Sequence, residues 1–559
     1  MAPTLVGAID QGTTSTRFIL YRIVGDGRLD PVSSHQMEHK QIYPQPGCVP
    51  PPSSPRRPSA ARASISPVSS PNASPTPSLP HHSPPSWCEH DPEEIYANTL
   101  VCMEKALSTV PGGATASDVA CVGITNQRET TVAWRASTGA PLHNAVVWLD
   151  TRTARLCEDL EREFGDKDHF RATCGLPIST YFSGVKIRWL LDNVPAVAAA
   201  AAEGDARFGT VDAWLAHRLT AGAVYVTDVT NAARTMLMDL HTLTWHEPTL
   251  EKFGIPRDAL PRVVPSADPD AFGFVAEGPL AGTRISGALG DQHAATLGQR
   301  CAPGEAKNTY GTGCFMLLNT GAAPVPSSHG LLTTVAWRLG ADAAPAYALE
   351  GSVAIAGAGV QWLRDNLGVI ERASDVEALA ASVPDTGGVY FVPAFSGLFA
   401  PRWRSDARGV CVGLTQFSTK AHLARALLEA ICFQTRDVLE AMRKDADAAS
   451  ATGGLELARL RVDGGATANG LLMQTQADVL GIVVSRPADV ETTAMGAALA
   501  AGVGAGLWTE AALFEGAEQG AEQGADDTAF APAVDAKERE RRYERWCDAV
   551  ERSLNLAEK

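Results

Sequence analysis

The stretch LVGAIDQGTTSTRFILY, residues 5–21, contains two apolar runs joined by a short turn that is rich in hydroxyl groups. Each run predicts a buried strand, and Gly12 allows the backbone to turn sharply between them. The N–H groups and hydroxyls of residues 13–15 can line an anion site. Asp10 stands at the entrance of the turn, where it is placed to hold a hydrated Mg²⁺, an ion that prefers one or two carboxylates plus phosphate oxygens. Taken alone, the turn is equally compatible with an ordinary polar hairpin.

Length and charge limit the classes of protein to which the chain can belong. With 559 residues it is too long for one compact core, so we expect two or more domains. Its 45% hydrophobic and 20% charged residues are typical of a globular protein. The 47 Lys and Arg residues against 63 Asp and Glu give a formal charge of −16, which argues against nucleic acid or an anionic membrane as the main partner. Any phosphate binding must therefore be local.

The cysteines and the apolar segments indicate a reducing, cytoplasmic environment. The eleven cysteines are scattered without a CxxC pair, so neither a disulfide framework nor a zinc site is predicted. We expect no signal or transit peptide, because the sequence enters the first strand at once. Residues 494–507 are apolar but too few to span a bilayer, and their Ala/Gly composition predicts a close-packed helix.

Residues 48–86 differ in composition from the rest of the chain. Proline and serine account for 12 and 11 of these 39 residues, and large apolar side chains are almost absent. Such a segment cannot bury enough surface to offset chain entropy, so we predict that it is disordered. Without it the flanks read QIYPQPG followed by WCEHDP, a continuous loop that leads into a helix capped near Asp91. The segment is therefore interpreted as an insertion into a complete fold, either a retained intron or a regulatory loop rich in Ser-Pro sites.

Strand-like and helix-like patterns alternate along the rest of the chain, which is typical of an α/β protein. A second strand–turn–strand unit at residues 307–319 resembles the first one. Two such units predict two related lobes with a cleft between them, at residues 1–298 and 299–559. The repeated sequence at 515–524 is expected to be a surface loop. Further strands are expected at 119–124, 146–148 and 460–462, and helices at 185–193, 211–219, 357–367, 419–443, 469–480 and from 537 onward.

Three glycine-containing turns follow apolar strands, at residues 10–17, 311–313 and 463–465. Each of them, taken singly, is compatible with a purely structural turn. Together, with an acid or a threonine beside each glycine, they predict backbone clamps around one nucleotide. The first two turns would lie on the phosphates and the third near the adenosine.

The sequence GALGDQHA at 287–294 holds the candidate catalytic carboxylate. An aspartate directly after a glycine at a helix start is often only an N-cap, and that interpretation stays open. The functional alternative is that Asp291 accepts the proton of a substrate hydroxyl as that oxygen attacks phosphorus. His293 is interpreted as a structural neighbour rather than as the base.

Arg128 and Glu129 form an unusual charged pair at the end of a buried strand. The pair is either a structural salt bridge or a clamp, in which forked donors and acceptors hold two hydroxyls of a small polyol. Tyr181 adds a phenol, and Trp148 and Phe315 are placed to pack against the carbon backbone of such a polyol. Each aromatic residue, taken singly, is more often part of a core than of a ligand site.

Several motifs together resemble the glycerol kinases of the FGGY family of carbohydrate kinases, within the actin/Hsp70 ATPase superfamily. They include DQGTTSTR at 10–17, GITNQRETTVAW at 123–134, TDVTNAARTML at 227–237, GDQHAA at 290–295, KNTYGTGCF at 307–315, LEGS at 349–352 and RVDGGATAN at 461–469. The resemblance covers nearly the whole chain outside 48–86. It implies two RNase H-like lobes of the actin/Hsp70 type, an N-terminal one that binds a polyol and a C-terminal one that binds a nucleotide, with the catalytic cleft between them.

The resemblance implies ATP-dependent phosphorylation of glycerol to sn-glycerol 3-phosphate, the entry step of glycerol catabolism. Asp291 would be the general base for in-line transfer, Asp10 would approach Mg²⁺, and Arg17 would neutralise phosphate charge. A homodimer or a homotetramer is compatible with the resemblance. The residues implied to contact glycerol are Arg128, Glu129, Trp148, Tyr181, Asp291, Gln292 and Phe315. Those implied to contact ATP are Thr13, Thr14, Ser15, Arg17, Thr312, Gly357, Gln361, Gly465 and Asn469.

The chain departs from the family pattern at three places. The segment 48–86 is extra, and Arg402 stands where tyrosine is more usual, which affects only local loop contacts. Residues 277–284 lack the GGKGG-like loop with which bacterial members respond to fructose 1,6-bisphosphate, so we expect no such regulation. Three alternatives stay open: a kinase for another polyol or a ketose such as xylulose, an ATP-driven conformational machine, and an enzyme disabled by its insertion.

Overall fold

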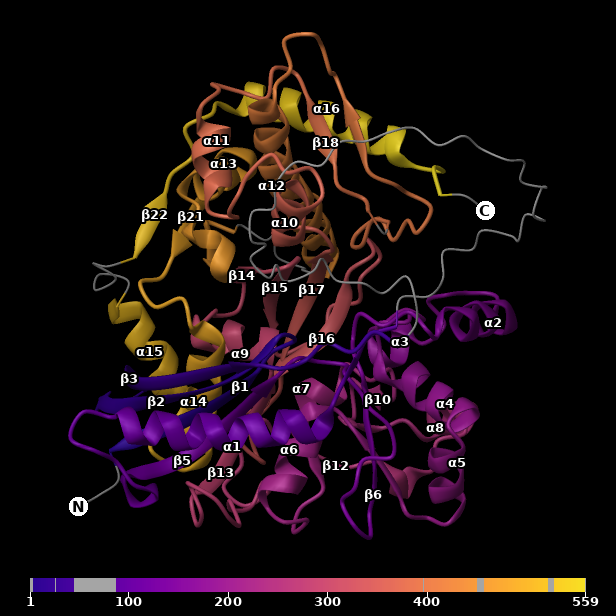
Figure 1. Ribbon diagram of the computed structural model, residues 1–559, viewed down its shortest axis with the longest axis vertical. Coiled ribbons are helices and arrows are strands. Elements are labelled where there is room, and N and C mark those ends of the chain that lie inside the picture. The colour runs from indigo at the N-terminus through magenta and orange to yellow at the C-terminus, as the bar shows by residue number, and fades with distance from the viewer. Residues whose placement is uncertain are drawn as a thin grey trace, which may run out of the picture.

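The computed structural model describes residues 4–25, 27–44, 87–395, 397–449, 457–520 and 527–557. The chain forms two α/β halves, each built around its own β-sheet with helices packed against it (Figure 1). The prediction of a two-lobed α/β fold is confirmed. The boundary between residues 298 and 299 stays a prediction, and the segment 48–86, predicted to be disordered, lies outside the described residues.

The first sheet has five strands in the order β13-β5-β1-β2-β3. These are β1 Leu5–Gln11, β2 Ser15–Gly25, β3 Arg28–Glu38, β5 Val119–Asn126 and β13 Arg284–Gly290. Strands β1 and β2 form the predicted hairpin, whereas β5 runs parallel to both β1 and β13. The last residues of the three parallel strands, Gln11, Asn126 and Gly290, are in register. The turns that follow these strands therefore emerge side by side at one edge of the sheet.

The second sheet repeats this arrangement within seven strands, in the order β16-β17-β15-β14-β20-β21-β22. Its strands are β14 Ala306–Tyr310, β15 Cys314–Gly321, β16 Leu332–Trp337, β17 Ala346–Val353, β20 Arg459–Asp463, β21 Val483–Arg486 and β22 Thr528–Phe530. Strands β14 and β15 form an antiparallel hairpin, and β20 runs parallel to β14, as β5 does to β1. The prediction of two related strand–turn–strand units is confirmed.

Helix α14, Thr492–Gly504, belongs to the second half of the sequence but packs against the first sheet (Figure 1). A Cβ atom on Gly123 of β5 would collide with the backbone of Ala497 in α14. A Cβ atom on Gly496 of α14 would collide with the backbone of Ala294, which lies in α9, Asp291–Gly298. Small residues thus allow the backbones to approach closely, which confirms the close-packed helix predicted there.

The remaining helices surround the two sheets, and the upper part of Figure 1 is formed by helices of the second half of the chain. In the first half they are α1 Pro92–Thr109, α2 Ala154–Phe164, α3 Arg171–Cys174, α4 Ser183–Asn193, α5 Pro195–Ala202, α6 Val211–Leu219, α7 Val229–Ala232 and α8 Glu247–Phe253. In the second half they are α10 Gly357–Asp365, α11 Asp375–Ala381, α12 Lys420–Ala449, α13 Gly470–Leu480, α15 Glu510–Gly520 and α16 Ala536–Ser553. Among the described residues, none of these helices combines the length and the apolar character that a membrane crossing needs.

The two flanks of the proline- and serine-rich segment are hydrogen-bonded to each other. The N–H groups of Ile42 and Glu89 donate to each other's carbonyl oxygens at 2.9 and 2.8 Å, and His90 Nε2 lies 2.8 Å from Gln41 Oε1. Helix α1 begins directly afterwards, with Asp91 as its N-cap, as predicted. The described residues on the two sides of the segment therefore lie next to each other, which agrees with an insertion into a complete structure.

Three local expectations are revised or refined. The loop predicted at 515–524 is wrong for residues 515–520, which form the end of α15, because their Ala, Glu and Gln residues favour a helix. The strand predicted at 146–148 is shorter, with β7 at Ala145–Val146. The guanidinium of Arg402 lies 3.4 Å from the carboxylate of Asp437 in α12, so its contact extends beyond its own loop.

Candidate active site

The predicted polyol and phosphate residues meet where the turns of the first sheet face the second hairpin. Trp148 contacts both the first turn and the second hairpin. Its indole Nε1 donates to Thr13 Oγ1 at 2.9 Å, and its ring centroid lies 5.9 Å from that of Phe315 in β15. On the other side the Trp148 ring lies 5.5 Å from the ring of Tyr181. The three aromatic residues thus form one wall, to which both halves of the chain contribute.

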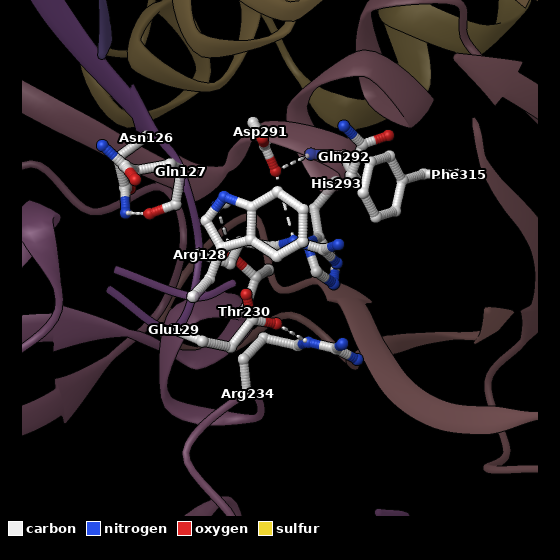
Figure 2. Close-up of polar contacts among 12 residues, drawn as sticks. Asn126, Gln127, Arg128, Glu129, Thr230, Arg234, Asp291, Gln292, His293 and Phe315 are labelled. Carbon is white, nitrogen blue, oxygen red and sulfur yellow. Dashed lines mark hydrogen bonds and ion pairs between the residues drawn. The ribbon is translucent and has the colours of Figure 1, made fainter. Parts of the chain in front are cut away.

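Arg128 lies near Asp291 (Figure 2) and is held from two sides, by Glu350 and by Asp291. Its terminal nitrogens Nη1 and Nη2 donate to the two carboxylate oxygens of Glu350, at 2.5 and 2.8 Å. Its Nε lies 3.1 Å from Asp291 Oδ1. The residue is only 3% exposed. Burial disfavours the charged form, but Glu350 and the other nearby acids raise the pKa of Arg128 well above its usual value, so it stays charged.

Glu129 has a different partner from Arg128, so the pair is not the simple mutual salt bridge that stayed open above. Its Oε1 accepts from Arg234 Nε at 2.7 Å, as Figure 2 shows. Arg234 Nη2 in turn lies 3.4 Å from Glu350 Oε1. The backbone of Glu129 has φ 59°, a conformation rare outside glycine, and burial raises the pKa of its carboxyl group.

Asp291 is the first residue of α9 and follows β13 directly. The N-cap of the helix is Gly290 and has no side-chain capping bond, so the alternative that Asp291 is merely an N-cap is wrong. Instead its Oδ1 accepts the N–H of Gln292 at 2.7 Å and faces Arg128. Burial raises the pKa of Asp291, and the charge of Arg128 opposes that rise. The Gly290 N–H donates to Thr230 Oγ1 at 2.9 Å, which fixes the junction between β13 and α9.

The neighbours of Asp291 on α9 are both buried. Gln292 Oε1 accepts from Lys307 Nζ of β14 at 2.5 Å, and the same ammonium donates to Thr309 Oγ1 at 2.8 Å. His293 Nε2 lies 3.3 Å from Thr334 Oγ1. Burial lowers the pKa of His293 well below its usual value, so the imidazole is neutral, in agreement with a structural role.

The first predicted phosphate turn, at 10–17, closes with a 2.9 Å bond from the Gly12 N–H to the carbonyl of Ser15. Arg17 at its exit donates to Gln36 Oε1 from Nη2 and Nε, at 2.7 and 3.0 Å. It also forms an ion pair with Glu491, a partner that the sequence did not reveal. The predicted phosphate-binding arginine is thus paired with a carboxylate.

Asp10 has the electrostatic setting of a metal-binding carboxylate. Burial raises its pKa to about 7; the charge of Arg17 opposes this rise, and the negative charges of Glu491 and Asp291 add to it. A divalent cation would relieve that repulsion. Within the described residues no group of three acidic, His or Cys side chains forms a complete cage. A single carboxylate nevertheless fits Mg²⁺, which keeps several waters and binds phosphate oxygens.

The other two predicted nucleotide turns lie together at the end of β14. The N–H groups of Ala356 and Ala358 donate to the carbonyl of Thr312 at 2.9 and 3.0 Å, which seats the start of α10 on the turn at 311–313. Gly464, with φ 90°, packs so closely on the backbone of Tyr310 that a Cβ atom would not fit. The turn at 463–465 therefore adjoins the turn at 311–313, as a shared nucleotide clamp requires.

The remaining predicted nucleotide residues surround these turns. Gln361 on α10 is exposed, and Gly357 opens that helix. The side chain of Asn469 caps α13, because its Oδ1 accepts the Leu472 N–H at 2.8 Å, which leaves its amide nitrogen to contact a ligand. Thr14 in the first turn is exposed, and Ser15 Oγ accepts from Gln36 Nε2 at 2.8 Å. The structure describes all the predicted site residues, and Glu350, Arg234, Lys307 and Glu491 are additions to them.

Comparison with known proteins identifies relatives along the whole chain. A model of the N-terminal domain of the FGGY family of carbohydrate kinases matches residues 72–298, and a model of its C-terminal domain matches residues 306–505. The chain is 51% identical to the glycerol kinase of Arabidopsis thaliana, over 99% of this chain and 98% of that protein.

Two crystal structures resemble this chain in fold but differ in their sequence identity to it. The glycerol kinase of Plasmodium falciparum with ADP superposes with a TM-score of 0.82 and 35% identity, over 99% of both chains. The ligand-bound xylulose kinase of Lactobacillus acidophilus superposes with a TM-score of 0.75, over 98% of this chain and 97% of that one, but with 20% identity. That second likeness shows the fold alone.

Proposed function

The chain belongs to the FGGY family of carbohydrate kinases, and within that family we propose that it phosphorylates a terminal hydroxyl of glycerol with ATP, giving sn-glycerol 3-phosphate and ADP. The observation that supports this reaction is the arrangement around Asp291. A carboxylate, an arginine paired with it, and three aromatic rings meet in one place, in a chain half identical to a glycerol kinase. Such an arrangement suits a small molecule that is polar along one face and has C–H groups along the other.

Asp291 is proposed as the general base. Its carboxylate takes the proton of the terminal hydroxyl while that oxygen forms a bond to the γ-phosphorus of ATP, and the bond to the leaving oxygen of ADP breaks with its electron pair. Burial raises the pKa of Asp291, which makes the carboxylate a stronger base than an exposed aspartate. The charge of Arg128, only 3.1 Å away, opposes that rise and favours the ionised form.

The polyol is proposed to lie between Arg128, Glu129 and Gln292, with its carbon atoms against Trp148, Tyr181 and Phe315. Glu129 and Gln292 supply acceptors, and both are fixed by cations, Arg234 and Lys307 respectively. Fixed donors and acceptors reduce the entropy lost when a flexible triol binds in one orientation.

The triphosphate is proposed to lie on the turns at 12–15 and 311–313, with Gly357, Gln361, Gly465 and Asn469 around the nucleoside. Mg²⁺ would be held by Asp10, directly or through water, and when bound it neutralises charge on the transferred phosphoryl group. Arg17 is proposed to exchange Glu491 for a phosphate oxygen. Positioning and charge neutralisation of this kind supply most of the rate enhancement in phosphoryl transfer.

Several finer proposals accompany this function. We propose a cytoplasmic enzyme, supported by the ten cysteines of the described residues, all of which are free thiols. The first half would carry the polyol and the second half the nucleotide, divided near residue 298. A homodimer or homotetramer stays a proposal to be tested by light scattering of the purified protein.

An acceptor panel tests the proposed function. ADP release is measured with ATP, Mg²⁺ and glycerol, erythritol, dihydroxyacetone or xylulose, and the product is assigned by ³¹P NMR. We expect kcat/KM for glycerol to exceed that for xylulose by about a hundredfold, because poorly matched hydroxyls leave buried polar groups unpaired. A preference for xylulose would contradict the substrate assignment, and ATP hydrolysis unaffected by any acceptor would favour an ATP-driven conformational machine.

A further inference from the structure

The two halves of the chain are connected by a buried carboxylate at the candidate polyol site. Glu350 lies in the middle of β17, paired with Leu317 of β15 on one side and Leu332 of β16 on the other. It is fully buried and binds Arg128, which is 222 residues away in sequence and follows β5 of the first sheet. A side chain of the proposed nucleotide half thus holds a side chain of the proposed polyol half.

Titratable side chains of both kinds lie around Glu350. Three basic residues, Arg128, Arg234 and Lys307, interact with the acids Glu129, Glu350 and Asp291. Burial opposes ionisation of Glu350, but Arg128 and Arg234 lower its pKa to about 2, so it is charged. An arginine buried without such a partner would destabilise the fold strongly.

The geometry of the Arg128–Glu350 pair fixes the orientation of the guanidinium. Two hydrogen bonds of 2.5 and 2.8 Å join both terminal nitrogens to the two carboxylate oxygens, a bidentate contact that restricts rotation of the guanidinium. The Nε is then left facing Asp291 at 3.1 Å, and each terminal nitrogen keeps one further N–H group. Any rotation that moved these groups away from the polyol site would break two charge-assisted hydrogen bonds.

We infer that Glu350 is a positioning residue for glycerol, which orients Arg128 and thereby makes the polyol site depend on the second half of the chain. The inference rests on the proposed function and adds a specificity role for a residue that does not itself need to touch the substrate. Glu350 keeps its bonds when glycerol binds, so the polyol receives only the remaining N–H groups of Arg128.

The substitution Glu350→Gln tests this role with little change in volume. A neutral amide can accept only one of the two bonds, and its NH₂ group faces a cation. We expect KM for glycerol to rise roughly tenfold to a hundredfold, the range for losing one charged hydrogen bond. KM for ATP should change less than about threefold. Glu350→Asp, which keeps the charge but is shorter, should recover part of the glycerol affinity.

The matched control is Glu429→Gln. Glu429 is a buried acid of α12 that also contacts two arginines, Arg425 at 3.4 Å and Arg542 at 2.7 Å, beside α16. A purely structural role of Glu350 predicts that both variants lose thermal stability alike while KM for glycerol stays unchanged in each. KM does not depend on the folded fraction, so an unstable variant can be measured at low temperature. An unchanged KM in Glu350→Gln overturns the inference.

A crystal structure of the unaltered enzyme with glycerol gives a second test that needs no variant. Retention of both Arg128–Glu350 bonds beside bound glycerol supports the inference, whereas an Arg128 that has left Glu350 for the polyol overturns it. Failure of the wild-type enzyme to phosphorylate glycerol would refute the proposed function instead, so the two failures are distinguishable.

Discussion

The substitution Asp291→Asn separates chemistry from binding at the proposed site. In the wild type, Asp291 Oδ1 accepts the Gln292 N–H at 2.7 Å, and an asparagine oxygen can still accept it. A neutral amide, however, cannot accept the proton of a glycerol hydroxyl. Arg128 loses a negative charge at 3.1 Å, yet its two bonds to Glu350 remain. The polyol side chains should therefore keep their positions while the base is lost.

The expected effect is confined to turnover. A general base contributes about 10²- to 10⁴-fold, so kcat should fall by that factor, which corresponds to roughly 3–5 kcal/mol of transition-state stabilisation. KM for glycerol and for ATP should stay within about threefold of the wild type.

Stability should move in the opposite direction to activity. Burial raises the pKa of Asp291, so the folded state favours the protonated side chain, and the stability that it contributes is lost as pH rises through the folded pKa. Above the folded pKa the wild type carries an ionised carboxylate that burial disfavours. The neutral amide removes that penalty, and Tm at pH 8 should be unchanged or higher.

The assay couples ADP release to NADH oxidation and records Tm by differential scanning fluorimetry. Asp268→Asn is the control, because its carboxylate accepts only the N–H groups of Asp270 and Ala271, both at 2.9 Å. Turnover above a tenth of the wild-type value in Asp291→Asn would refute Asp291 as the base. A fall in Tm with unchanged turnover would assign it a structural role instead.

Four other predictions concern single features. Arg128→Ala should raise KM for glycerol by at least about tenfold and leave KM for ATP nearly unchanged, since it removes a charged donor to the polyol; an unchanged glycerol KM would exclude the clamp. Asp10 has a folded pKa of about 7, so the affinity for Mg²⁺ should fall about tenfold for each pH unit below that value, because the proton competes with the metal. The measurement is the rise in Tm on addition of Mg²⁺ as a function of pH, and Asp10→Asn should abolish its pH dependence. Deletion of 48–86 should give a folded, active enzyme, because the flanks already bond to each other at Ile42 and Glu89; loss of folding would favour a structural role for the segment. Fructose 1,6-bisphosphate should not inhibit, because the loop at 277–284 lacks the GGKGG-like sequence, and inhibition at millimolar concentration would contradict this.

The hairpins and turns could be predicted from the sequence because neighbouring residues determine them. Strand-like segments on both sides of the glycine-containing turns at 10–17 and 311–313 are sufficient to specify strand, turn and strand. The helix boundaries follow from equally local signals, such as the Asp91 cap of α1. The tail was predicted wrongly at 515–520, where a repeated sequence suggested a loop although its composition favours a helix.

The charged partners within the site could not be predicted, because they come from distant parts of the chain. Arg234 lies 105 residues from Glu129, and Glu350 lies 222 residues from Arg128. Periodicity carries no information about such pairs. The signal that was present is the Arg128–Glu129 pair itself: two charges buried after a strand require counter-charges, and the motifs at 227–237 and 349–352 contain them.

The two arginines of the site differ in how firmly their carboxylate partners hold them, and this difference matches their proposed roles. Glu491, the partner of Arg17, has a side chain that is 42% exposed, whereas Glu350 is fully buried. Exposed ion pairs contribute about 0–1 kcal/mol, so a triphosphate can take Arg17 from Glu491 at little cost. Separating a buried pair is far more costly, about 3–5 kcal/mol, which exceeds what a neutral hydroxyl can offer. Arg17 is therefore expected to exchange Glu491 for a phosphate oxygen on nucleotide binding. Arg128 is expected to keep its bonds to Glu350 while its remaining N–H groups donate to glycerol.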